Sequence, residues 1–64
     1  MKRRDLERFL KVNGWRYLRA GGSHDVWTNG REIEAVPRHR EVNEFLARKI
    51  MKTVLAKPGK TEDR

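Results

Sequence analysis

The chain has 64 residues and contains no cysteine, so disulfides, thiol catalysis and thiolate zinc sites are excluded. Sixteen Lys and Arg against nine Asp and Glu leave a net charge of +7, which favours a polyanion such as nucleic acid as partner over a merely solvated surface. A chain of this length forms one domain with a small core, so we expect any chemistry on an open face.

The first predicted element is an amphipathic helix over residues 2–13. Leu6, Phe9 and Leu10 recur at the three- and four-residue spacing of one helix face, with charged residues between them. Asn13-Gly14 tolerates left-handed backbone geometry and is expected to end this helix.

Three strands are predicted next, over residues 15–19, 24–28 and 31 or 32 to 36. Between the second and third strands, Asn29-Gly30 favours a two-residue type I′ turn because both residues accept positive φ angles. That turn places Thr28 opposite Arg31 and His24 opposite Ala35.

Directly opposed residues share a face of the sheet, which predicts the two sides of this hairpin. We expect His24, at the rim of the sheet, on the helix-covered side, together with Val26, Ile33 and Ala35. The opposite, open side is expected to carry Asp25, Trp27, Glu32 and Glu34.

Pro37 is expected to end the third strand, and a second helix is predicted over residues 41–56. Pro58-Gly59 then breaks the pattern, giving a domain over residues 1–57 and a polar tail, expected to be disordered, over 58–64. The order of elements predicts an α+β two-layer sandwich with both helices on one face of a three-stranded antiparallel sheet. Folds of the double-stranded-RNA-binding type have this order.

The segment from Gly21 to His24 is the best candidate for chemistry. Gly21 and Gly22 let the backbone approach a phosphate closely, and Ser23 adds a hydroxyl donor. An imidazole with an ordinary pKa of about 6.5 can accept the proton of a ribose 2′-hydroxyl near neutral pH. RNA supplies its own nucleophile, so this chemistry requires neither metal nor cofactor, and none is expected. On spacing alone, such a segment is more often a plain turn followed by a structural histidine.

Several segments together resemble the HicA toxin family over about residues 2–56. The most specific part of the resemblance is Gly-Ser-His combined with a downstream Pro-x-His at the end of the third strand. The segments are Lys2-Arg3-Arg4-Asp5-Leu6, Asn13-Gly14-Trp15, Arg19, Gly22-Ser23-His24, Val26-Trp27, Val36-Pro37-Arg38-His39, and Leu46, Lys49 and Ile50 in the closing helix.

The resemblance implies a double-stranded-RNA-binding-like fold and a ribosome-independent mRNA interferase paired with a HicB-type antitoxin. It assigns catalysis to His24, with Gly22 and Ser23 shaping its turn. Many relatives carry a second histidine directly after the first, whereas this chain has Asp25, so no role is carried over to that position. With no apolar run long enough for a membrane span and no signal-peptide hydrophobic region, we expect a cytoplasmic protein that makes no membrane contact.

His39 is a second candidate proton carrier, although a plain linking residue before the last helix is the more common role for such a position. Trp27 is expected to stack on an RNA base if it lies on the open sheet face, with cross-strand packing or an antitoxin contact as alternatives. The candidate phosphate contacts are Lys2, Arg3, Arg4, Arg19, Arg38 and Arg40.

Two other functions fit the sequence. One is a non-catalytic small RNA-binding module in which His24 is incidental. The other is a purely structural subunit held by a partner protein. RNA cleavage separates the first from an interferase, and the salt dependence of binding separates phosphate contact from a protein interface.

Overall fold

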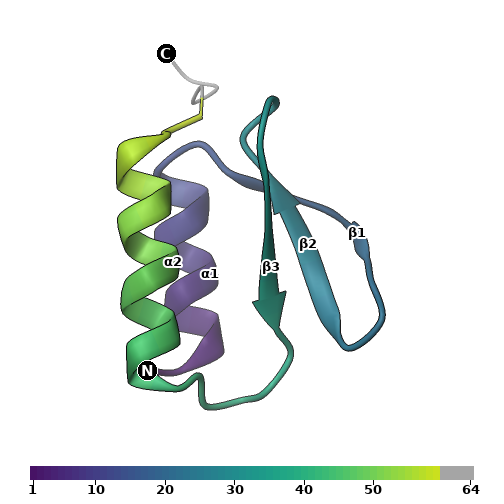
Figure 1. Cartoon of the computed structure of the whole chain (residues 1–64), viewed down its shortest axis with the longest axis vertical. Coiled ribbons are helices and arrows are strands. Elements are labelled where there is room, and N and C mark those ends of the chain that lie inside the picture. Colours follow the sequence, from purple (N-terminus) through teal and green to yellow (C-terminus); the bar gives the residue numbers. More distant parts are fainter. Residues whose placement is uncertain (60–64) are drawn as a thin grey trace.

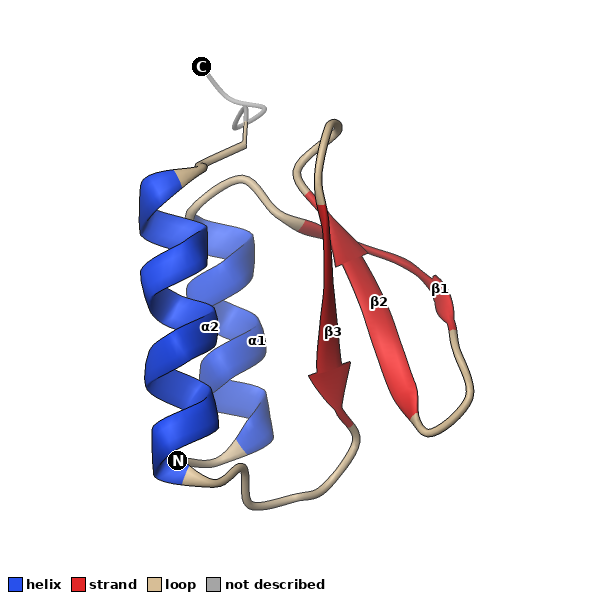
Figure 2. Cartoon of the chain, in the orientation of Figure 1, coloured by secondary structure: helices blue, strands red, loops and turns tan. Residues whose placement is uncertain are grey.

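The computed structural model describes residues 1–59 of the chain. The elements follow in the order α1 (Arg3–Val12), β1 (Arg16–Ala20), β2 (His24–Thr28), β3 (Ile33–Pro37) and α2 (Glu44–Ala56). The strands form one antiparallel sheet in the order β1-β2-β3, and both helices lie on the same side of it, with β1 farthest from them (Figure 1). The predicted α+β order is confirmed, and Figure 2 shows the two helices as one layer and the three strands as the other.

Helix α1 forms and ends as its sequence pattern predicts. Leu6 and Leu10 are fully buried one turn apart, and Asn13 donates from its side-chain amide to the carbonyl of Phe9 at 2.9 Å. Gly14 then adopts a φ of +84°, which directs the chain away from the helix into β1.

Helix α2 begins later than predicted, at Glu44 rather than residue 41. The Oδ1 of Asn43 accepts the backbone N–H groups of Phe45 and Leu46, so this residue is the N-cap. Residues 41 and 42 instead pair with the N-terminal segment, where the N–H of Val42 donates to the carbonyl of Met1 at 2.7 Å. Val42 lies before the helix but is buried in the core, so its apolar side chain at helical spacing resembled a helix position.

The predicted register of the β2–β3 hairpin is wrong by two residues. Thr28 lies opposite Ile33, which leaves residues 29–32 as the loop. Side chains close this loop: Asn29 Oδ1 accepts the N–H groups of Arg31 and Glu32 at 2.8 and 2.7 Å, and Thr28 Oγ1 donates to the Glu32 carbonyl at 2.7 Å. These bonds stabilise a longer turn than Asn29-Gly30 alone predicts.

The predicted sides of the sheet are also exchanged. Trp27 and Val36 are 2% and 0% exposed and belong to the core under the helices, whereas Ile33 is 59% exposed on the opposite face. A two-residue shift keeps the same residues together on one face, so the register error did not cause the exchange. The helices cover the face that carries Trp27 and Val36, and burying the Trp27 indole there removes a large apolar surface from water.

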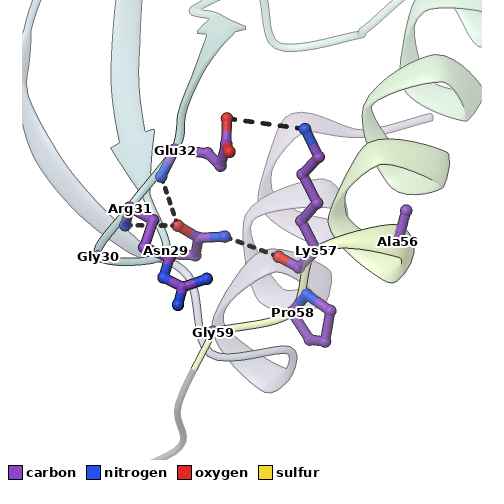
Figure 3. A pocket seen from close by; sticks show the side chains of 8 residues that line it. All are labelled: Asn29, Gly30, Arg31, Glu32, Ala56, Lys57, Pro58 and Gly59. Carbon is purple, nitrogen blue, oxygen red and sulfur yellow. Dashed lines mark hydrogen bonds and ion pairs between the residues drawn. The ribbon is translucent and has the colours of Figure 1, made fainter.

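The C-terminal end of α2 is attached to both the hairpin loop and the core. The carbonyl of Lys57 accepts the indole N–H of Trp15 at 3.0 Å and the side-chain amide of Asn29 at 2.9 Å. Figure 3 shows the Asn29 contact beside the Lys57–Glu32 ion pair, in a depression of about 680 Å³.

The N–H of Gly59 donates to the carbonyl of Asn13 at 2.8 Å, so packing contacts extend into the segment expected to be a tail. The rest of that expected tail, residues 60–64, lies outside the described residues. Within residues 1–59, neither helix is long and apolar enough to cross a lipid bilayer.

Candidate functional site

His24 is the first residue of β2 and its side chain is exposed. It lies opposite Pro37, at the end of the sheet where the chain leaves β3. The prediction that it stands at the rim of the sheet is confirmed, but it shares the face of Val26 and Ala35, which points away from the helices. The imidazole is therefore open to solvent on the uncovered side of the sheet.

The two glycines in the turn before His24 differ in their surroundings: Gly21 is closely packed and Gly22 faces open space. The N–H of Gly21 donates to the carbonyl of His24 at 2.8 Å and closes the turn. A Cβ added at Gly21 would lie 3.2 Å from Val26 Cγ2, whereas one added at Gly22 would meet nothing within 4 Å. The backbone at Gly22 is thus directly accessible to a large group such as a phosphodiester.

Arg38 holds this turn from the end of β3. Its Nε donates to Asp25 Oδ1 at 2.9 Å, and its Nη2 donates to the carbonyls of Gly21 and His24 at 2.7 and 3.3 Å. The sequence placed Arg38 among the phosphate contacts, but these two guanidinium nitrogens are engaged with the protein. Sequence reasoning missed the pair with Asp25 because the partners are 13 residues apart, and their pairing depends on the hairpin register.

His39 lies in the segment between β3 and α2, and its side chain is exposed. The observed register places His24 opposite Pro37, two residues before His39, where the predicted register placed it opposite Ala35. Within the described part of the chain, no hydrogen bond or ion pair joins the two imidazoles. Residues 1–59 also contain no group of three His, Cys, Asp or Glu side chains placed to hold a metal ion.

Four of the predicted phosphate contacts line one depression of about 310 Å³ at the start of α1. We call it the basic cleft, and its residues are Lys2, Arg3, Arg4 and Arg40. The cleft forms because the N–H of Arg3 donates to the carbonyl of Arg40 at 2.9 Å, and because Lys2 pairs with Glu41 as an isolated bridge. The positive end of the α1 dipole adds to the field of these side chains.

Of the other two predicted phosphate contacts, Arg38 is bound to the His24 turn and Arg19 lies outside the basic cleft. Arg19 is exposed on β1 opposite Val26, on the same sheet face as His24. Trp27 is buried, so the interpretation that it stacks on RNA from the open face is wrong. The alternative of cross-strand packing is observed, since its ring meets that of Tyr17 edge to face with centroids 6.2 Å apart.

These observations define a small basic α+β protein with an exposed histidine beside an open glycine turn and a cationic cleft. A family model described as the HicA toxin of bacterial toxin–antitoxin systems matches residues 3–54. The chain therefore belongs to the HicA toxin family, and the resemblance inferred from its motifs is confirmed. Comparison with curated proteins and with solved structures gives no significant match.

Proposed function

We propose that this HicA toxin is an endoribonuclease, a ribosome-independent mRNA interferase that cleaves RNA through His24 without requiring a metal. The observation that supports it is the exposed imidazole of His24 next to the open backbone at Gly22. An RNA backbone can reach this rim without displacing a side chain at Gly22. The reacting groups would meet on the sheet face that no helix covers.

In the proposed reaction the ribose 2′-oxygen attacks the adjacent phosphorus and the bond from phosphorus to the 5′-oxygen breaks. Neutral His24 accepts the 2′-hydroxyl proton. In this proposal the N–H of Gly22 and the hydroxyl of Ser23 donate to the charged phosphate oxygens. The products are a 2′,3′-cyclic phosphate and a 5′-hydroxyl, and the 5′-oxygen needs one proton as it leaves. His39, which follows β3 two residues after the partner of His24, is our candidate for that proton donor.

The basic cleft is the proposed site for the RNA backbone beyond the scissile bond. Lys2 precedes α1, Arg3 and Arg4 are the first two residues of α1, and Arg40 follows β3. Arg38 connects the segment after β3 to the His24 turn. Contacts of this kind neutralise phosphates whatever the base sequence, so we expect the affinity for RNA to fall steeply with salt. Arg19 offers a further positive charge on the face of His24.

We further propose a HicB-type antitoxin as the protein partner that restrains the toxin. Membership of the HicA family supports this partner. The net charge of +7 favours an acidic antitoxin surface, which would compete with RNA for the same cations.

The proposed function is tested with purified protein and a single-stranded RNA in the presence of a chelator. We expect wild type to produce 2′,3′-cyclic phosphate ends and His24→Ala to produce none, while RNA binding of the variant stays within a few-fold of wild type. Because the His24 side chain is exposed, this variant should keep the thermal stability of wild type. His39→Ala, measured in parallel, reports whether the second imidazole carries a proton.

Cleavage by His24→Ala at the wild-type rate would contradict the assignment. Intact RNA that nevertheless binds wild-type protein would instead indicate the non-catalytic RNA-binding module.

A further inference from the structure

We propose that Arg38 is the positioning residue of the His24 turn and that Asp25 holds Arg38 in place. This inference rests on the proposed function of His24. It assigns to both residues the role of fixing where the imidazole stands, rather than contact with RNA.

Among residues 1–59, the side-chain hydrogen bonds of Arg38 go to the segment that carries His24. They reach the Asp25 carboxylate and the carbonyls of Gly21 and His24, which flank the open backbone at Gly22. The His24 carbonyl also accepts the N–H of Gly21, so both ends of the turn are tied to each other and to β3. A planar guanidinium donates in several directions at once, which an ammonium group does not reproduce in a fixed geometry.

Arg38 and Asp25 pair on the side of the sheet opposite to the His24 imidazole. Asp25 lies opposite Val36 on the helix-covered side of the sheet, whereas the preceding residue, His24, faces the other side. The Asp25 side chain is 20% exposed and the Arg38 side chain 42%, so the ion pair is partly shielded from solvent. Arg38 therefore binds the backbone of His24 from the helix-covered side of the sheet, through a hydrogen bond to its carbonyl.

Arg38 is hydrogen-bonded in turn to a residue of the basic cleft. Arg3 Nη1 donates to the carbonyl of Arg38 at 2.6 Å, and Arg3 lines the cleft. A continuous series of hydrogen bonds thus joins α1, the end of β3 and the glycine turn. It fixes the distance between the cations that would bind the RNA backbone and the imidazole that would act on it.

The test compares Arg38→Lys with Arg38→Ala, because lysine keeps the charge and loses the guanidinium geometry. A positioning role predicts that both variants lower kcat by about tenfold to a hundredfold, since a displacement of about 1 Å at a reacting group has effects of this size. KM should stay within about twofold of wild type in both. Arg31→Lys is the matched control, because Arg31 lies in the β2–β3 loop at the opposite end of the strands, and it should cleave as wild type does.

A phosphate contact gives a different pattern. Arg38→Lys would then retain most of the activity, while Arg38→Ala would raise KM and reduce the slope of log affinity against log salt by about one. That result would overturn the inference. Under a positioning role, Asp25→Ala is expected to lower kcat in the same direction, and combining it with Arg38→Ala should add little to the effect of Arg38→Ala alone.

A second measurement does not depend on activity. We expect the Gly21 amide, which donates to the His24 carbonyl, to exchange with solvent at least about tenfold faster in Arg38→Ala and in Asp25→Ala than in wild type. Amides of buried Leu10 and Ile50 should keep their protection, which shows that the variants are folded. Unchanged exchange at Gly21 would refute the positioning role even if His24 proved not to be catalytic. Cleavage by His24→Ala would refute the proposed function without altering this result.

Discussion

The two tryptophans provide a matched test of the hydrogen bonding in the core. Trp15 and Trp27 are each 2% exposed and both belong to the buried cluster, so replacing either by phenylalanine removes a similar amount of buried surface. Their indole N–H groups differ. That of Trp15 donates to the carbonyl of Lys57 at 3.0 Å, whereas that of Trp27 is buried with no hydrogen-bond partner among the described residues.

Trp15→Phe should therefore destabilise the protein more than Trp27→Phe does. The first substitution loses a net hydrogen bond of about 0.5–1.5 kcal/mol, and the second removes an unpaired buried donor whose cost is about 1–3 kcal/mol. The free energies of unfolding of the two variants should thus differ by at least about 1.5 kcal/mol, or at least about 6 °C in Tm for a domain of this size. The Lys57 carbonyl still accepts from Asn29 in Trp15→Phe, and the phenyl ring in Trp27→Phe can keep the edge contact with Tyr17.

Urea and thermal unfolding followed by far-ultraviolet circular dichroism measure this difference without depending on tryptophan fluorescence. The denaturant m value should be the same in both variants, so that the midpoints report stability alone. Equal losses, or a larger loss for Trp27→Phe, would refute the reasoning from hydrogen bonding.

Substitutions at two glycines should separate folding from function. Gly14→Ala should strongly lower Tm, because the φ of Gly14 is +84° and a Cβ there would lie 2.3 Å from the Gly59 backbone. Gly22→Ala should leave Tm unchanged, because a Cβ there meets nothing within 4 Å, and should slow RNA cleavage. Equal losses of Tm in the two variants would contradict this expectation. Burial raises the pKa of the Glu34 carboxyl, and the charge of Lys49 opposes that shift. Glu34 therefore stabilises the fold at pH values below the pKa that it has in the unfolded chain. This contribution is lost as the pH rises through the pKa of Glu34 in the folded protein. Glu34→Gln should accordingly gain stability over wild type at pH 7, and urea titrations should show the gain shrinking towards pH 4; a gain that grows on acidification would refute the assigned sign.

The prediction of the elements succeeded where local chemistry decides the backbone. The spacing of Leu6 and Leu10 defined the buried face of α1, and Asn13-Gly14 ended it, because these signals act within a turn or two of the chain. The motif around His24 likewise predicted an exposed residue at the rim of the sheet and pointed to the HicA family. The start of α2 was missed because Val42 has helical spacing although it packs from an extended segment.

By itself, the sequence determined the order of the elements, which strand residues share a face, and the family of the protein. Only the tertiary structure decided which face the helices cover, because both faces of the hairpin carry apolar residues and the choice depends on burying Trp27. It also decided that Arg38 binds the His24 turn, where the sequence predicted a phosphate contact. It decided as well that the start of α1 meets the segment after β3 in the basic cleft. These contacts join residues far apart in the chain, and their formation depends on packing of the whole domain rather than on local backbone preference.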